Sequence, residues 1–264
     1  MAEKNTPELW DRAWQREVTP ERDAYDRARE EAGVRWKRTD RLIDRRLGGF
    51  DGLSVIELGA GAGTVAACMA ARGANVTVLD YSMKALARSR QFFERAGITG
   101  EFVEANALAL PRPLRGAYDV SMSHGLAEHF TGAERARIVA AHLQVLRDGG
   151  VALISVPNAA NPPYRVYKAL AELTGFWGSG EEYPFRRREF ETMMAELGVT
   201  DFGFFGDSFA RSWQWLSPVR IGRKLLKRPE PTDTAHIRPE REGGLDERWS
   251  YALVLWAVKD GRMP

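Results

Sequence analysis

The chain has 264 residues, of which 44% are hydrophobic and 28% charged, a composition typical of one soluble globular domain with extensions. Its 38 Lys and Arg residues nearly balance 36 Asp and Glu residues, which argues against a dedicated nucleic-acid binder. A single cysteine, Cys68, excludes an internal disulfide framework and a cysteine-based zinc site. Residues 1–9 lack an apolar signal core, and no apolar run approaches the length of a membrane span, so we expect a cytoplasmic protein.

The predicted elements begin with a charged, helical N-terminal part and continue as an alternation of strands and helices. This alternation predicts one Rossmann-like α/β domain with a mostly parallel sheet. Helical patterns with capping signals occupy the gaps between several of the apolar runs. In chain order, the expected strands are 53–58, 74–79, 100–104, 118–122, 150–156, 199–205 and 249–258, and the expected helices are 62–72, 82–96, 132–147 and 187–197.

Three additions surround this domain. We expect residues 1–50 to form an N-terminal helical part and residues 51–264 to form the domain, interrupted by insertions at 157–185 and 207–248. Within the second insertion, residues 211–228 contain six basic residues and no acid. This stretch could contact an anionic surface or substrate, or it could be a solvated helix over a pocket.

A glycine-rich loop follows the first expected strand. Residues 57–64 read Glu-Leu-Gly-Ala-Gly-Ala-Gly-Thr, and glycines here let the backbone turn sharply and approach a ligand at the start of a helix. Asp80 ends the second expected strand, where a carboxylate can accept hydrogen bonds from both hydroxyls of a ribose. The two features together predict a nucleoside-containing cofactor at the carboxyl ends of the strands.

The spacing of the loop narrows the choice of cofactor. It is Gly-x-Gly-x-Gly rather than the Gly-x-Gly-x-x-Gly of dinucleotide enzymes, and no Gly-Lys-Ser/Thr follows it. Glu57, two residues before the first glycine, would be unfavourable beside a pyrophosphate. It suits the cationic methionine part of S-adenosylmethionine (SAM), which we therefore expect as the cofactor.

Five segments resemble, in order, the motifs of the class I SAM-dependent methyltransferases, over roughly residues 55–206. They are VIELGAGAG, LDYS, EFVEANALALP, YDVSMSHGLAEHF and LRDGGVALISVPN. The Glu128-His129 pair is similar to that of the small-molecule, ubiquinone-type O-methyltransferases. The resemblance implies a seven-stranded, mostly parallel sheet with an antiparallel last strand, helices on both faces, an N-terminal helical cover and lid insertions.

The resemblance also implies a set of cofactor-binding residues. The loop would pass beneath the ribose and methionine with Glu57 beside it, Asp80 would hold the ribose, and Tyr81 would lie against the adenine. Asn106 stands where many members have an aspartate, and its carbonyl could accept from the adenine amino group instead. The remaining members of this expected set are Gly59, Ala60, Gly61, Gly63, Ala105, Ala107, Ser123 and His124.

Two histidines are candidate general bases for a hydroxyl acceptor. SAM carries an activated methyl group, so the protein must mainly align the acceptor, exclude water and remove a proton. His129 and His124 suit that last task, although His129 could simply pack in its loop. We expect no metal, because Gly125 stands where the ubiquinone-type enzymes have a further acid.

The tryptophans predict where the acceptor binds. None of the eight falls between Asp51 and Asn158, so the expected cofactor half is free of them and the flanking parts carry all of them. Aromatic walls in a lid favour an aromatic, polyketide-like or glycosylated acceptor. The expected acceptor-binding residues are Trp10, Trp14, Asn158, Tyr164, Trp177 and Trp213.

Methylation of a small-molecule hydroxyl is the leading hypothesis, and several alternatives stay open. N- or C-methylation is hardly separated from it by sequence. A nicotinamide oxidoreductase is suggested by Tyr164-x-x-x-Lys168, but Val65 stands where that class has the last glycine of its loop. The chain could also bind SAM without transferring a methyl group. Asn161-Pro162-Pro163-Tyr164 resembles an amino-group methyltransferase motif, but it follows the fifth strand instead of the fourth.

Overall fold

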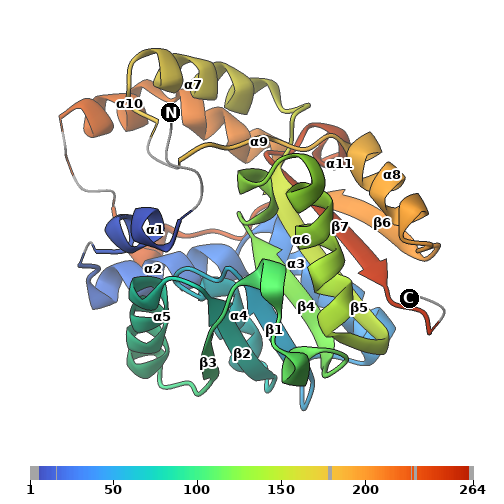
Figure 1. Ribbon diagram of the computed structural model, residues 1–264. Coiled ribbons are helices and arrows are strands. Elements are labelled where there is room, and N and C mark those ends of the chain that lie inside the picture. The colour runs from blue at the N-terminus through green and yellow to red at the C-terminus, as the bar shows by residue number, and fades with distance from the viewer. Residues whose placement is uncertain (1–5, 16, 178–179, 227, 229–230, 262–264) are drawn as a thin grey trace.

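The computed structural model describes residues 6–15, 17–177, 180–226, 228 and 231–261. A seven-stranded sheet forms its centre, in the order β3-β2-β1-β4-β5-β7-β6 (Figure 1). β7 is antiparallel to β5 and β6, and the other strand pairs are parallel. The strands are β1 Ser54–Leu58, β2 Asn75–Asp80, β3 Glu101–Glu104, β4 Tyr118–His124, β5 Leu146–Pro157, β6 Phe202–Gly206 and β7 Ala252–Val258. The sequence-based prediction of the fold is therefore confirmed.

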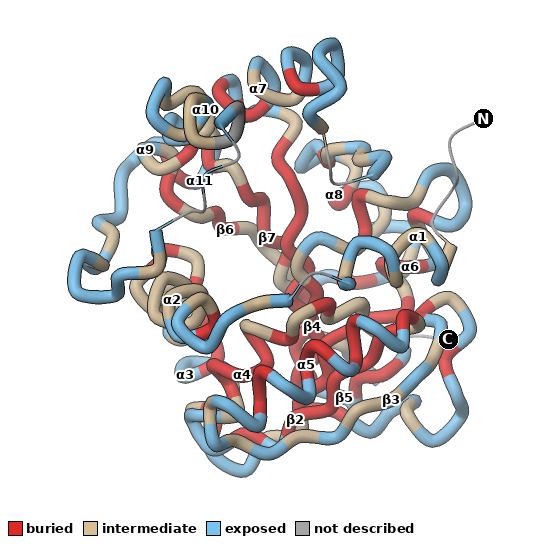
Figure 2. The backbone as a smooth tube through the Cα atoms, turned by 90° about the vertical axis from the view of Figure 1, so that its left-hand side faces the viewer, coloured by how far each residue is buried: buried red, intermediate tan, exposed pale blue. Residues whose placement is uncertain are grey.

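Helices cover both faces of the sheet, which explains why the central strands are almost continuously apolar. The apolar side chains of α3, α4 and α5 pack on one face, and those of α6 and α8 on the other. Figure 2 shows the central strands as buried and the outer sides of the helices as exposed. These helices are α3 Val34–Leu47, α4 Thr64–Ala70, α5 Met83–Ala96, α6 Gly132–Val145 and α8 Arg187–Glu196.

Local signals set the ends of α5 as the sequence predicts. The Ser82 hydroxyl accepts a hydrogen bond from the Ala85 backbone N–H at 3.1 Å, which caps the start of the helix. Gly97 closes it with a left-handed φ of 65°, a conformation that glycine adopts without steric penalty. Because the helix starts at this point, Asp80 and Ser82 stand together where β2 ends.

The remaining helices lie near the carboxyl ends of the parallel strands. Figure 1 shows α7, α9 and α10 together at the top of the view and α1 with α2 at its left. Their bounds are α1 Pro7–Ala13, α2 Pro20–Glu31, α7 Pro162–Leu173, α9 Phe209–Ser212, α10 Pro218–Leu225 and α11 Asp246–Trp249. Among the described residues, no helix is both long and apolar enough to cross a membrane.

Several predicted boundaries are wrong by two or more residues, and for two of them the hydrogen bonds show the cause. Trp249 is the last residue of α11 and not part of the closing strand, because the Asp246 carboxylate accepts from the N–H groups of Gly243 and Phe209 and fixes a helical turn there. β5 begins at Leu146 rather than 150. The Gly149 N–H donates to the carbonyl of Lys259, and the Lys259 N–H donates to the carbonyl of Gly150. The antiparallel pairing of β5 with the chain that follows β7 therefore extends beyond residue 150.

Candidate cofactor and acceptor site

A cavity of about 740 Å³ lies where β1, β2 and β4 end. The order of the sheet reverses around β1, and the crevice at such a point is the usual ligand site of open α/β sheets. The cavity wall brings together thirteen of the residues singled out in the sequence. They are Trp10, Trp14, Glu57, Gly59, Ala60, Gly61, Asp80, Tyr81, Ala105, Asn106, Ala107, His124 and His129.

The glycine loop needs its glycines for both conformation and space. Gly59 and Gly61 have φ values of 62° and 55°, in the left-handed region that strains other residues. A Cβ on Gly59 would overlap the side chain of Leu126, and one on Gly61 would overlap the indole of Trp14. Gly63, with a φ of 67°, precedes α4 and does not line the cavity.

Asp80 holds the loop in place from the end of β2. Its Oδ2 accepts from the Gly61 N–H at 3.0 Å, and its Oδ1 accepts from the Ser82 N–H at 2.9 Å. Burial raises the pKa of this carboxyl, while the backbone donors oppose the shift. Each oxygen has further lone pairs, so the carboxylate can still accept from ligand hydroxyls in the cavity.

Glu57 and His124 form a buried pair beside the loop. Glu57 is 2% exposed, and its Oε2 accepts from the Ala66 N–H at 3.2 Å. Its Oε1 lies 3.5 Å from Nδ1 of His124, a buried nitrogen that has no hydrogen-bond partner among the described residues. The pair thus offers a carboxylate and an unsatisfied ring nitrogen at the mouth of the loop, a polar environment that fits a cationic ligand group.

The expected adenine-side residues differ in what they can still bind. Oδ1 of Asn106 accepts from the Leu108 N–H at 2.8 Å, capping a short 3-10 turn at Ala107–Ala109, and one lone pair of this oxygen remains for a ligand. Tyr81 lines the cavity, and burial raises the pKa of its hydroxyl. Ser123 is fully buried with an unpartnered hydroxyl and does not line the cavity.

His129 lies under the N-terminal helix. Its ring meets that of Trp10 edge-on, with centroids 4.8 Å apart. Nδ1 lies 2.8 Å from the carbonyl oxygen of Glu181, so that nitrogen carries the proton of the neutral ring. Burial lowers the pKa of His129, against the opposing effect of the Glu181 and Gly125 backbone groups, and this favours the neutral form.

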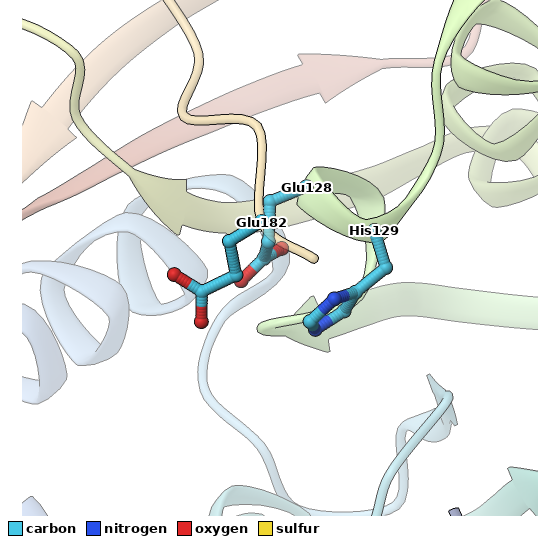
Figure 3. Close-up of side chains that lie close together, drawn as sticks. All are labelled: Glu128, His129 and Glu182. Carbon is cyan, nitrogen blue, oxygen red and sulfur yellow. The ribbon is translucent and has the colours of Figure 1, made fainter. Parts of the chain in front are cut away.

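Two carboxyl groups lie beside this histidine (Figure 3). One potential ligand atom from each of Glu128, His129 and Glu182 falls within 4.8 Å of the others. Burial raises the pKa of Glu128 to about 8 and also raises that of Glu182, which accepts from the Tyr164 hydroxyl at 3.0 Å. Without a cation beside them, burial thus favours the protonated form of both carboxyls.

Four expected acceptor-binding residues lie outside the cavity wall. The amide of Asn158 donates to the carbonyls of Arg248 and Ser250, and the hydroxyl of Tyr164 is engaged with Glu182. Trp177 donates to the carbonyl of Gly180 at 2.9 Å, and Trp213 is 54% exposed. These four residues do not line the cavity, so the structure gives no support to their predicted role in binding the acceptor.

Two sequence motifs have structural roles. Asn161 caps α7, its Oδ1 accepting from the Tyr164 N–H at 2.7 Å, so the Asn-Pro-Pro-Tyr segment begins a helix. Lys168 pairs with Glu172 and not with the Tyr164 hydroxyl. The arrangement expected of a dehydrogenase tyrosine-lysine pair is therefore not formed.

Sequence reasoning missed a set of charged and aromatic residues that also line the cavity. They come from α2, from the first turn of α3 and from the chain between β6 and β7, and no motif connects these segments. The set comprises Asp26, Arg29, Glu30, Arg35, Asp207, Gln214, Glu240 and Tyr251. Their convergence depends on the tertiary fold.

Comparison with known proteins identifies the domain. Residues 55–150 match a family model of a methyltransferase domain. The ubiquinone biosynthesis O-methyltransferase of Nitrosomonas europaea is 32% identical over 127 residues, 47% of this chain and 52% of that protein. Its counterpart in Aromatoleum aromaticum is 34% identical over 116 residues, 44% and 48% respectively. The chain thus spans about half the length of the curated relatives it matches.

A solved structure extends the likeness of the fold to nearly the whole chain. Magnesium protoporphyrin IX methyltransferase from Synechocystis PCC 6803, with S-adenosylhomocysteine (SAH) bound, has a TM-score of 0.54. The match covers 96% of this chain and 93% of that one, at 14% identity. The sheet order and the glycine loop agree with the domain match, so residues 55–150 form a methyltransferase domain similar to those of the class I SAM-dependent methyltransferases.

Proposed function

We propose that the protein transfers the methyl group of SAM to a hydroxyl group of a small aromatic, polyketide-like or glycosylated acceptor. One observation carries this proposal: the cofactor loop, both candidate bases and aromatic side chains line a single cavity. A volume of about 740 Å³ suits two ligands of metabolite size. The O-methyltransferase names of the curated relatives support oxygen as the methylated atom.

The cofactor half of the cavity would hold SAM, which supplies a methyl group activated on a sulfonium. Glu57 lies where it can attract the positively charged methionine part, and Asp80 lies where it can accept from the ribose hydroxyls. Gly59 and Gly61 let the loop turn at positive φ, which places its backbone along the cavity. These residues position the cofactor and leave the acceptor to bind in the rest of the cavity.

We propose that α1 is the cover of this site. Trp14 contacts the loop, Trp10 contacts His129, and Asp11 fastens the helix by accepting from the Ser82 hydroxyl at 2.5 Å. α3 has a different place, because its Trp36 is buried in the core of the sheet. A cover made by α1 and α2 would exclude water from a transfer that water competes with.

We propose His129 as the general base, with His124 as the second candidate. A neutral ring whose Nδ1 donates to the Glu181 carbonyl has its lone pair on Nε2, which is the atom that must accept the acceptor's proton. His124 lies against Glu57 and so belongs more closely to the cofactor end.

Calorimetry and product analysis test this function together. The protein should bind SAM and SAH and should not bind NADPH, which would indicate an oxidoreductase. Incubation with methyl-labelled SAM and hydroxylated aromatic acceptors should give a labelled methyl ether. A label on nitrogen or carbon would refute the choice of atom, and SAM binding without product from any acceptor in a cell extract would indicate a non-catalytic SAM-binding protein.

A further inference from the structure

Arginine side chains line one part of the cavity beside the aromatic rings. Arg29 comes from α2, and Arg211 and Arg220 come from the segment between β6 and β7. Arg211 and Arg220 belong to the basic stretch 211–228. From the sequence alone, this stretch could contact either an anionic surface or an anionic substrate. Both arginines line the cavity, so the anion that they attract can be a ligand inside the protein.

The acidic groups of this wall already have partners. Glu30 pairs with Arg35 at 2.6 Å, and Glu240 pairs with Arg211 at 2.9 Å. Asp26 pairs at 2.7 Å with Arg22, which does not line the cavity. Asp207 accepts a hydrogen bond from the Ala252 N–H at 3.0 Å. Among the described residues, none of these four carboxylates forms an ion pair with Arg29.

Arg29 has a different environment. Within the part of the chain that the structure describes, it forms no ion pair, and its Nη2 donates only to Oε1 of Gln214 at 3.4 Å. Its guanidinium lies 5.9 Å from the centre of the Tyr25 ring. Burial, together with the positive charges of Arg211 and Arg220, lowers the pKa of Arg29 against the opposing charge of Glu240. The wall therefore presents a partly desolvated cation that, among the described residues, has no carboxylate at ion-pair distance.

An aromatic surface adjoins the second arginine, Arg220. The guanidinium of Arg220 lies 4.5 Å from the centre of the Trp215 ring, and the Trp215 and Tyr251 rings are 5.1 Å apart between centroids. Tyr167 of α7 supports Trp215 from a centroid distance of 5.1 Å. Trp215 and Tyr251 line the cavity and are held by these neighbours, so they offer a fixed apolar face beside the arginines.

We propose that the acceptor carries an anionic group, a carboxylate or a phosphate, which binds to Arg29 and Arg220 while its ring packs against Trp215 and Tyr251. A guanidinium fork matches the geometry of either anion and binds it more strongly than a neutral acceptor. The anion would place a counter-charge within ion-pair distance of Arg29, closer than the carboxylate of Glu240. This inference rests on the proposed function, because it assigns the binding group of the acceptor in the same cavity.

The test uses the SAH-loaded full chain and small hydroxylated aromatic probes. Calorimetry compares 4-hydroxybenzoate, 4-hydroxyphenyl phosphate and the neutral methyl 4-hydroxybenzoate on the wild type, Arg29→Gln and Arg115→Gln. Arg115 is an exposed arginine outside the cavity, so Arg115→Gln removes the same charge elsewhere. We expect at least one anionic probe to bind the wild type more tightly than the ester. Arg29→Gln should weaken that probe about tenfold or more, and Arg115→Gln should not.

The outcomes separate this inference from the proposed function. SAH affinity is measured for the wild type and for each variant. A wild type that does not bind SAH would refute the proposed function itself. Equal binding of the ester and both anions, no binding of either anion, or unchanged affinity in Arg29→Gln would each overturn the inference. Binding to phosphatidylglycerol vesicles, lost in Arg220→Gln and without affinity for either small anion, would overturn it in favour of a membrane surface. A preference between the two anions identifies the group as carboxylate or phosphate.

Discussion

The indole of Trp14 lies directly on Gly61, so closely that residue 61 has no room for a Cβ. This contact joins the N-terminal helix to the glycine loop, and Asp11 adds hydrogen bonds to the Ser82 hydroxyl and to the Lys84 N–H at 3.2 Å. The position of the proposed cover thus depends on the conformation of the loop beneath it.

Replacing Gly61 tests that dependence. Gly61→Ala should lower the free energy of unfolding by about 1–3 kcal/mol, because alanine is strained at a φ of 55° and its Cβ overlaps Trp14. In a Trp14→Ala background the loss should be smaller, since only the backbone strain remains. Thermal denaturation of the four proteins in this double-mutant cycle gives the coupling. Equal losses in both backgrounds would show that the contact contributes nothing.

Asp80 should contribute to cofactor affinity. Asp80→Asn should weaken SAH binding by about 1–3 kcal/mol, because the amide replaces an acceptor of the Gly61 and Ser82 N–H groups and of the ribose hydroxyls. Asp44→Asn is the matched control, since Asp44 is exposed on α3 and outside the cavity. Calorimetry with SAH measures both variants. An affinity for SAH that Asp80→Asn leaves unchanged would rule out the assigned role.

The two histidines should affect different kinetic constants. If His129 is the base, His129→Gln should lower kcat by roughly 10²–10⁴-fold and leave the KM for SAM nearly unchanged. His124→Gln should mainly raise the KM for SAM, because it removes the neighbour of Glu57. His236→Gln is the control, at an exposed position outside the cavity. A decrease of less than tenfold for His129→Gln would favour a packing role.

Glu128 predicts a pH dependence of stability. Its pKa of about 8 in the folded protein lies above the ordinary value of 4.5, so the folded state binds more protons than the unfolded state between these limits. Stability should therefore decrease as pH rises through that window. Glu128→Gln should flatten the dependence and be relatively more stable at pH 8, while Glu94→Gln, at an exposed position on α5, should behave as wild type. Urea denaturation from pH 6 to 8.5 measures this, and parallel curves would contradict it.

We expect methyl transfer to be independent of divalent metals. Gly125 stands where the ubiquinone-type O-methyltransferases have a further acid, so the trio of Glu128, His129 and Glu182 lacks that ligand. Treatment with EDTA should leave the rate of methyl transfer unchanged, and added Mg²⁺ or Zn²⁺ should not raise the Tm. If EDTA abolished activity, and Mg²⁺ restored it in the wild type but not in Glu182→Gln, the trio would instead be a metal site.

Much of the cofactor half of the cavity could be predicted because its residues lie in short segments directly after successive strands. The glycine loop, Asp80 and Ser82 belong to strand-to-helix turns, where local geometry dictates residue type. The acceptor side could not be predicted in this way. Trp177 and Trp213 have suitable chemistry but do not line the cavity, whereas Arg29 and Tyr251 line it from opposite ends of the chain. Only the packing of α2 against the segment between β6 and β7 brings such residues together.

Transfer of a trideuteromethyl group from labelled SAM tests the central claim most directly. The protein is incubated with the labelled cofactor and a panel of hydroxylated aromatic acids and phosphates, and the products are analysed by mass spectrometry and NMR. The account predicts a trideuteromethyl ether of an anionic acceptor, formed by the wild type and strongly reduced in His129→Gln and in Arg29→Gln. A label carried on nitrogen or carbon, or a neutral acceptor methylated equally well by Arg29→Gln, would contradict it.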